Sequence, residues 1–210
     1  MGRLGAAVFA AFVSTVQISS AAVIDGLVTS GVGEFEQIFD TSGLVVGQNN
    51  QQQNNLFSFN EKQAFVLDRD IDADIGGTIS EGTKVSSHYV FFDPVRGVQT
   101  GYVDFDGAIL GIITSLGKLI GTDDFGLDEV VYLSRRFRGL EGRDTVGIDE
   151  SSPSRLLVDW RASNPGDYIR VITAVPIASA PLPASSLMLF GGVVILALAH
   201  HWRRRRRNTN

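Results

Sequence analysis

The sequence has no cysteine and little histidine. Without cysteine among its 210 residues, disulfide bonds, thiolate metal ligands and cysteine nucleophiles are excluded. Any folded part must therefore be stabilised by packing, or by a metal held through other ligands. Two of the three histidines, His200 and His201, lie close to the C-terminus, so His88 is the one histidine in the central part of the chain.

The patterns of the common catalytic sites are also missing. There is no G-x-S-x-G elbow, no phosphate-binding or dinucleotide-binding glycine loop and no zinc-ligand cluster. His88 follows two serines, but it alternates with Tyr89 inside a predicted strand, which indicates a hydrogen-bonded structural histidine. Carboxylates are plentiful, yet no spacing singles out a glycosidase-type pair. The sequence therefore predicts a protein that is not an enzyme.

Charge is strongly segregated along the chain. All 23 acidic residues lie between Asp25 and Asp167, whereas six of the 18 basic residues are Arg3 and the five consecutive arginines near the C-terminus. The central part consequently carries a formal charge of −11. A domain of that charge repels nucleic acid and anionic lipid, so we expect no nucleic-acid partner.

Residues 23–175 show the pattern of an all-β domain. Short runs of Val, Ile, Phe and Tyr, separated by Gly and Asp-Pro turns, predict an antiparallel, jelly-roll-like β-sandwich of about nine strands. The amide-rich tract Gly47–Asn55 predicts an exposed loop, and Leu116–Ile120 predicts a single helical turn. The expected strands include residues 33–39, 64–75, 84–92, 99–106, 108–114, 129–137, 155–160 and 168–175.

One predicted strand carries the best candidate for a metal site. Over residues 64–75, apolar residues alternate with four aspartates, which would line one solvent-facing side. Alternatively, Asp70, Asp72, Asp74 and Glu81 have the first, third, fifth and twelfth positions of a calcium loop. Ile75 stands where such a loop needs glycine, so calcium remains an alternative to an acidic strand face without metal.

The N-terminal residues 1–22 have the organisation of a secretory signal peptide. Arg3 is followed by an apolar region and then by the small residues that precede a cleavage site, so we expect cleavage after Ala21 or Ala22. The translocon would then be a partner, and the domain would lie outside the cytoplasm.

The C-terminal part has three successive segments. A proline-containing hinge at 176–184 precedes an apolar segment at 185–202, which is 18 residues long and would span about 27 Å as a helix. The hydrocarbon core of a bilayer is about 30 Å thick, so a transmembrane helix here is only just long enough. The tail at 203–210 would stop transfer in the membrane through its arginines. These are Arg203, Arg204, Arg205, Arg206 and Arg207.

This order of hinge, apolar helix and arginines resembles the PEP-CTERM class of bacterial sorting signals. The hinge resembles the VPLPA variant, with alanine where that variant usually has its first valine: Ala180, Pro181, Leu182, Pro183 and Ala184. Further segments resemble ones that recur in exported proteins with this tail, namely residues 87–94, 107–114, 139–141 and 165–173.

The resemblance implies processing by an exosortase, a membrane transpeptidase that removes the helix and arginines. The protein would be anchored transiently in the inner membrane and then lie at the cell surface or in the exopolysaccharide of a biofilm matrix. Two alternatives remain open. One is a carbohydrate-binding module that uses exposed aromatics, with Trp160, Tyr102 and Tyr132 as candidates, and the other is a hydrolase acting on polysaccharide.

Overall fold

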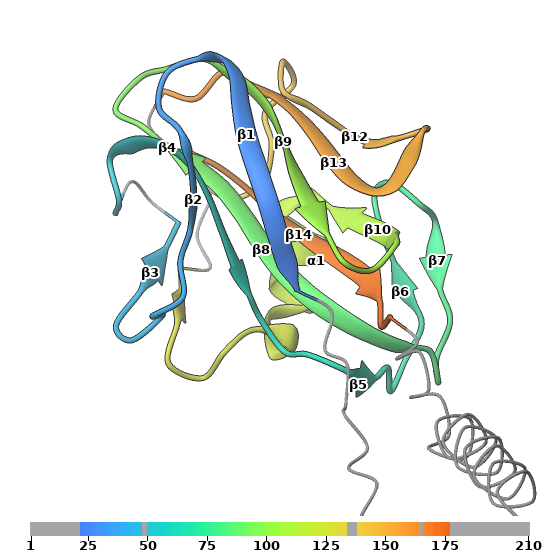
Figure 1. Cartoon of the computed structure of the whole chain (residues 1–210). Coiled ribbons are helices and arrows are strands. Elements are labelled where there is room, and N and C mark those ends of the chain that lie inside the picture. Colours follow the sequence, from blue (N-terminus) through green and yellow to red (C-terminus); the bar gives the residue numbers. More distant parts are fainter. Residues whose placement is uncertain (1–21, 48–49, 134–137, 164–165, 177–210) are drawn as a thin grey trace, which may run out of the picture. The chain divides into compact units, whose positions relative to one another are not determined.

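The computed structural model describes residues 22–47, 50–133, 138–163 and 166–176. Within these ranges the chain consists mainly of β-strands, which confirms the all-β prediction (Figure 1). No helix in the described ranges is long and apolar enough to cross a membrane. The predicted transmembrane helix at 185–202, the sorting motif at 180–184, the arginine tail and all of the predicted signal peptide except Ala22 lie outside the described residues.

A four-stranded antiparallel sheet forms one layer. Its strand order is β1-β9-β13-β12, and the ladder between β9 and β13 runs in continuous register from Trp160 opposite Gln99 to Arg155 opposite Asp104. The strands are β1 (Val23–Gly31), β9 (Gln99–Phe105), β13 (Ser152–Trp160) and β12 (Thr145–Asp149).

A six-stranded sheet forms the second layer. Its order is β10-β14-β8-β4-β2, with β5 pairing to the first residues of β8. All these pairs are antiparallel except β2 with β4, so the sheet is mixed. The strands are β10 (Ile109–Ile113), β14 (Asp167–Ala174), β8 (Lys84–Asp93), β4 (Gln53–Asn60), β2 (Phe35–Gln37) and β5 (Phe65–Val66).

Short elements cover the six-stranded sheet on its other side. Two small sheets pair β3 with β11 in parallel and β6 with β7 antiparallel. The short helix α1 is followed by a 3-10 turn, η1. These elements are β3 (Val45–Val46), β11 (Val131–Tyr132), β6 (Ile71–Asp72), β7 (Thr78–Ile79), α1 (Leu116–Gly121) and η1 (Asp123–Phe125).

The two large sheets pack face to face over one hydrophobic core. Val103 and Trp160 of the four-stranded sheet meet Val90, Phe92 and their neighbours in the six-stranded sheet. These side chains are the inward-facing members of a period-two alternation, as two packed sheets require. The arrangement is therefore sandwich-like, in agreement with the coarse prediction.

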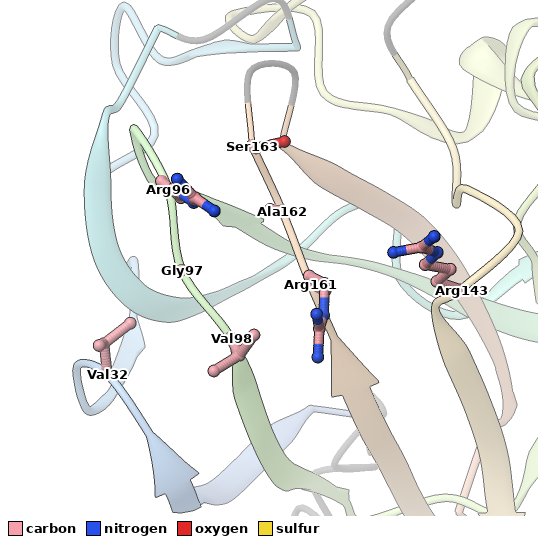
Figure 2. A pocket seen from close by; sticks show the side chains of 8 residues that line it. All are labelled: Val32, Arg96, Gly97, Val98, Arg143, Arg161, Ala162 and Ser163. Carbon is pink, nitrogen blue, oxygen red and sulfur yellow. The ribbon is translucent and has the colours of Figure 1, made fainter.

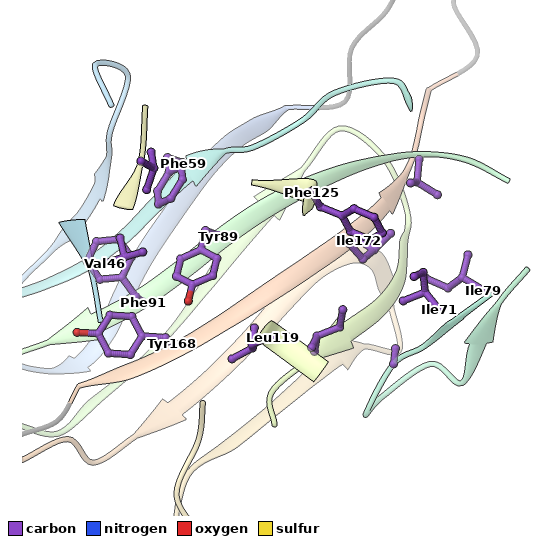
Figure 3. Packing of buried hydrophobic residues seen from close by; sticks show 14 of the residues in the cluster. Val46, Phe59, Ile71, Ile79, Tyr89, Phe91, Leu119, Phe125, Tyr168 and Ile172 are labelled. Atoms are coloured by element: carbon purple, nitrogen blue, oxygen red, sulfur yellow. The ribbon is translucent and has the colours of Figure 1, made fainter. Parts of the chain in front are cut away.

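A second core lies on the opposite face of the six-stranded sheet (Figure 3). Tyr89 and Phe91 of β8 and Tyr168 of β14 pack there against Leu119 of α1 and Val46 of β3. The ring of Phe91 stacks on Tyr168 with 5.7 Å between centroids. Because both faces are covered, nine of the ten residues of β8 are buried. The six-stranded sheet is thus an interior layer, and polar residues within it need partners from the protein itself.

The prediction of a single strand over residues 64–75 is wrong. The chain forms β5, then a loop, then the short β6, and it turns back at Gly76 and Gly77 to reach β7. Both glycines have positive φ, at 98° and 85°, which side chains other than glycine rarely adopt. The alternation of buried and exposed residues was read correctly, since Leu67, Ile71 and Ala73 are buried while the aspartates face solvent.

Two long strands were not predicted. β1 has few buried residues of its own, and β4 begins at Gln53 within the tract expected to be an exposed loop. Both strands form because neighbouring strands supply their hydrogen bonds, β9 for β1 and β8 for β4. Such pairing outweighs the weak strand preference of glutamine and asparagine. By contrast, α1 and the bounds of β8, β9 and β10 agree closely with the predictions.

Candidate functional site

His88 is buried between the two large sheets and has a structural role. Its Nδ1 lies 2.9 Å from Asn60 Oδ1, and its Nε2 lies 3.0 Å from Thr173 Oγ1. Burial lowers the pKa of His88 to about 3, so the ring is neutral at ordinary pH. The neighbouring Ser87 donates instead to Glu61, with Oγ 2.6 Å from Oε2. Both ring nitrogens of His88 thus have partners other than serine, unlike the histidine of a catalytic triad.

The proposed calcium ligands are engaged by the protein itself. Lys118 Nζ lies 2.9 Å from Asp72 Oδ2 and 3.0 Å from Asp74 Oδ1, so an ammonium group lies between these two carboxylates. Asp74 also accepts hydrogen bonds from the backbone N–H groups of Thr114 and Ser115, at 2.7 and 2.8 Å. Burial raises its pKa, but these donors and Lys118 outweigh that effect and lower the pKa to about 2.

The remaining two members of the proposed calcium set interact with each other. Asp70 Oδ1 accepts a hydrogen bond from the backbone N–H of Glu81, at 2.8 Å. In the described part of the chain, no three His, Cys, Asp or Glu side chains gather into a group that could hold a metal. The aspartates instead fix the start of α1 and the turn before β8.

The three aromatic candidates for sugar binding lie in different places. Trp160 is only 1% exposed and belongs to the core between the large sheets, so it cannot stack on a ligand. Tyr132 packs edge-on against Tyr89 on the other side of the six-stranded sheet. Tyr102 alone lies on the solvent-facing side of the four-stranded sheet, which we call the outer face. The guanidinium of Arg155 covers one side of its ring at 3.9 Å from the centroid.

A buried ion pair joins Arg170 of β14 to Glu61, the residue after β4. Arg170 Nε lies 2.6 Å from Glu61 Oε2, Arg170 Nη2 lies 2.8 Å from Glu61 Oε1, and both side chains are fully buried. Burial acts to lower the pKa of Arg170, but the Glu61 carboxylate outweighs it and raises this pKa. Nη1 completes its bonds with Leu119 O and Thr122 Oγ1, at 3.0 and 2.8 Å. No solvent reaches this pair, so it organises the fold and does not bind a ligand.

The outer face carries an apolar row across the four strands. The ladders place Leu27 opposite Tyr102, Tyr102 opposite Leu157, and Leu157 opposite Gly147. Leu27 and Leu157 are 49% and 42% exposed although both are large and hydrophobic. A Cβ built on Gly147 would meet nothing within 4 Å, so the row ends in open space.

A polar row lies next to the apolar row, displaced from it by two residues on each strand. It places Thr100 opposite Asp159 and Asp159 opposite Thr145. Thr100 Oγ1 donates to Asp159 Oδ1 at 3.3 Å. Tyr102 and Leu157 of the apolar row and the residues of the polar row line a shallow groove of about 410 Å³ on the outer face. Such a surface offers an aromatic ring, apolar side chains and hydroxyl groups side by side.

Beyond the polar row lies a second hollow, which we call the arginine pocket (Figure 2). Its volume is about 470 Å³, and it is formed by the turns at the ends of β1, β8 and β13 and the loop before β12. Its arginines are exposed, and no carboxylate among the described residues forms an ion pair with any of them. The lining residues are Val32, Arg96, Gly97, Val98, Arg143, Arg161, Ala162 and Ser163.

Comparison of the chain with protein-family models, with curated proteins and with solved structures gives no match. The candidate site therefore rests on its own geometry. Neither the groove nor the arginine pocket is lined by two carboxylates, because Asp159 is the single acidic residue between them. That composition does not suit glycoside hydrolysis, which uses a pair of carboxyl groups.

Sequence reasoning missed most of this surface. Tyr102 was identified, but Leu27, Leu157 and the arginines were not. They come from four separate segments, and their proximity depends on a strand order in which β1 and β13 flank β9. Arg143 and Arg161 each lie within two residues of a strand end, which is a local feature of the arginine pocket. That both arginines lie on the same side of the four-stranded sheet follows only from the strand register.

Proposed function

We propose that the protein is an exported, non-catalytic component of the cell surface or extracellular matrix, sorted through its C-terminal signal. The observation that carries this proposal is the order of hinge, apolar segment and five arginines over residues 176–207. An exosortase would cut at the hinge, and the helix would serve as a temporary inner-membrane anchor. The working part would be the domain at 23–175, which we propose to be a jelly-roll-like sandwich.

The physical properties of the C-terminal segment support temporary anchoring. Eighteen residues span about 27 Å, slightly less than the bilayer core, and Gly191 and Gly192 weaken helix formation. Pro181 and Pro183 favour extended backbone, which suits recognition by a processing enzyme. A short helix beside an extended motif fits removal better than permanent retention.

Intact-mass analysis of the protein from its native host tests this proposal. We expect a species that has lost about 22 N-terminal residues and everything beyond the hinge. Replacing both Pro181 and Pro183 by alanine should leave the helix and arginines attached. The matched control is Pro176→Ala, which removes a hinge proline outside the motif and should still be processed. A wild-type protein that keeps Arg203 to Arg207 would contradict the proposal.

A contact of Ala22 supports one of the two expected signal-peptide cleavage positions over the other. The backbone nitrogen of Ala22 lies 2.6 Å from Asp106 Oδ1. Cleavage after Ala21 would turn this nitrogen into an ammonium group and the hydrogen bond into an ion pair, whereas cleavage after Ala22 would remove it. We therefore expect N-terminal sequencing of the mature protein to begin at Ala22.

The same contact predicts a small effect on stability. Asp106→Asn should lower the melting temperature of the mature protein more at low salt than at high salt, because an exposed ion pair is screened. Asp128→Asn, which removes an exposed carboxylate that has no ion-pair partner among the described residues, is the control. Sequencing that begins at Val23 would show that the Asp106 contact has no role in the mature protein.

We also infer a second function, binding of polysaccharide at the outer face. The observation that favours it is the adjacency of Tyr102, Leu27 and Leu157 to the hydroxyl groups of Thr100 and Thr145. Sugars present apolar ring faces and hydroxyl edges, and protein sites that bind them match both. This function would suit a matrix protein and needs no catalytic group.

A further inference from the structure

We propose that the arginine pocket binds the carboxylate groups of an anionic polysaccharide whose chain continues along the groove of the outer face. The inference rests on the proposed surface or matrix role, which places the domain among such polymers. It names the chemical class of the ligand, a polymer of uronic acids, and the residues that select it, Arg96, Arg143 and Arg161.

The first argument is electrostatic. The central part of the chain has a formal charge of −11, yet three arginines gather at one end of the sandwich without an ion-pair partner among the described carboxylates. In the same domain, Arg69, Arg138, Arg155 and Arg170 are all paired with aspartate or glutamate. Three unpaired guanidinium groups around one hollow create a local positive potential that attracts anions.

The second argument is that the backbone fixes the three arginine-bearing segments relative to one another. Gly97 N donates to Ala162 O at 2.9 Å, which joins the turn carrying Arg96 to the residue after Arg161. Arg161 N donates to Asp144 Oδ1 at 2.8 Å, which joins the same segment to the residue after Arg143. The attachment points of the side chains are thus set before any ligand arrives, which lowers the entropy cost of binding.

The third argument concerns the type of anion. Arginine binds carboxylates through two parallel hydrogen bonds, so a ring carboxylate is a good geometric partner. Val98 and Arg161 lie just beyond the paired ends of β9 and β13, two residues from Thr100 and Asp159 on the outer face. The arginine pocket, the polar row and the apolar row therefore follow one another along the strands at steps of about 7 Å. A chain lying along them would meet a cation, hydroxyl groups and an aromatic ring in turn.

The same geometry disfavours nucleic acid. A duplex has a dense line of phosphates over its whole length, and the domain offers it three arginines within a strongly acidic surface. A polyuronate has one carboxylate per sugar, and the apolar faces of its sugar rings can pack on Tyr102 and Leu157. The observations consequently favour polysaccharide.

The test measures binding of the full-length protein, purified in mild detergent, to immobilised polygalacturonate and to dextran, a neutral polymer. All proteins compared have Arg203 to Arg207 replaced by glutamine, because the arginine tail would itself bind a polyanion. We expect retention on polygalacturonate that weakens with added salt. The triple variant Arg96→Gln, Arg143→Gln, Arg161→Gln should bind polygalacturonate about tenfold less tightly or worse, since three charged hydrogen-bonding groups are lost. Its binding to dextran should not change.

A charge-matched control separates the pocket from net charge. The triple variant Lys62→Gln, Arg69→Gln, Lys84→Gln removes three positive charges elsewhere on the domain, and we expect its polygalacturonate affinity to stay within about threefold of wild type. If both triple variants bind polygalacturonate like wild type, or lose affinity equally, the arginine pocket is not the site. Tighter binding to a DNA duplex than to polygalacturonate would overturn the choice of ligand.

The outcomes also separate this inference from the functions on which it rests. Suppose that the wild-type protein binds dextran but not polygalacturonate, and that Tyr102→Ala abolishes the binding to dextran. The groove would then remain a sugar site, and the proposal that the arginine pocket binds carboxylates would be overturned. Failure of C-terminal processing in the native host would contradict the sorting proposal while leaving these binding measurements unaffected.

Discussion

Replacing Arg170 by methionine should lower the free energy of unfolding by about 3–5 kcal/mol, the usual cost of leaving a buried charge without its partner. Glu61 is fully buried, and the replacement would remove both bonds from Arg170 to its carboxylate while the carboxylate stays out of reach of solvent. Chemical denaturation of the folded domain, followed by tryptophan fluorescence, measures the change. Far-ultraviolet circular dichroism checks that the variant still folds.

Two further variants test whether the ion pair is the cause. Arg69→Met removes a partly exposed arginine that pairs with Asp124, and it should cost at most about 1 kcal/mol because solvent screens that pair. The double variant Glu61→Leu with Arg170→Met removes both buried charges and should be more stable than Arg170→Met alone. If the free energy of unfolding of Arg170→Met lies within about 1 kcal/mol of the wild-type value, the buried ion pair does not make the expected contribution to the stability of the fold.

Asp167→Asn should stabilise the protein at pH 8 and have little effect at pH 4. Burial, together with the charges of Asp144 and Glu141, raises the pKa of Asp167 to about 8 from its ordinary value of 3.8. Between pH 3.8 and about 8, Asp167 in the folded protein holds a proton that the same residue in the unfolded chain has released. Stability therefore falls as pH rises from about 4 to about 8, by up to about 5 kcal/mol at 1.36 kcal/mol per pKa unit.

The asparagine variant abolishes this titration, so its stability should change less with pH over the same interval. Thermal melts of both proteins at several pH values between 4 and 8 provide the measurement. Asp68→Asn, at an exposed position, should keep the pH dependence of wild type. Parallel pH profiles for wild type and Asp167→Asn would show that Asp167 is ionised in the folded protein throughout.

The sequence predicted the fold class and several strands because those strands have a clear alternation or firm boundaries. β9 alternates buried and less buried residues along its whole length, and turns precede and follow it. The strand predicted over residues 64–75 alternates equally well, but alternation reports only which side chains are buried. It does not show that the backbone continues straight, and Gly76 and Gly77 reverse the chain there.

The burial of the six-stranded sheet on both faces was not predicted. The run Tyr89 to Phe92 has four consecutive large apolar residues, which is typical of a strand covered on both sides. What covers the second face comes from short elements of two to six residues, such as β3, α1 and η1. Segments of that length contain too few residues to show a period, so their packing could not be foreseen.

The candidate site could be predicted only in part for a related reason. Tyr102 is conspicuous as an aromatic residue in a strand, whereas an exposed arginine in a turn has no distinguishing local pattern. Arg96 and Arg161 become neighbours through the pairing of β9 with β13, which joins residues about 60 positions apart. Contacts of that separation are set by topology and leave no mark in the local sequence.

The six-stranded sheet is covered on both faces, whereas the four-stranded sheet is open to solvent on one, and this difference determines where the sequence can vary. Most substitutions in β8 and β14 would disturb one of two cores, so these strands are constrained on every side chain. The outer face of β9, β12 and β13 contacts neither core, and its residues can change with little effect on folding. Chains that share this scaffold could therefore acquire different polymer preferences by exchanging a few surface residues, while the framework that carries them stays the same.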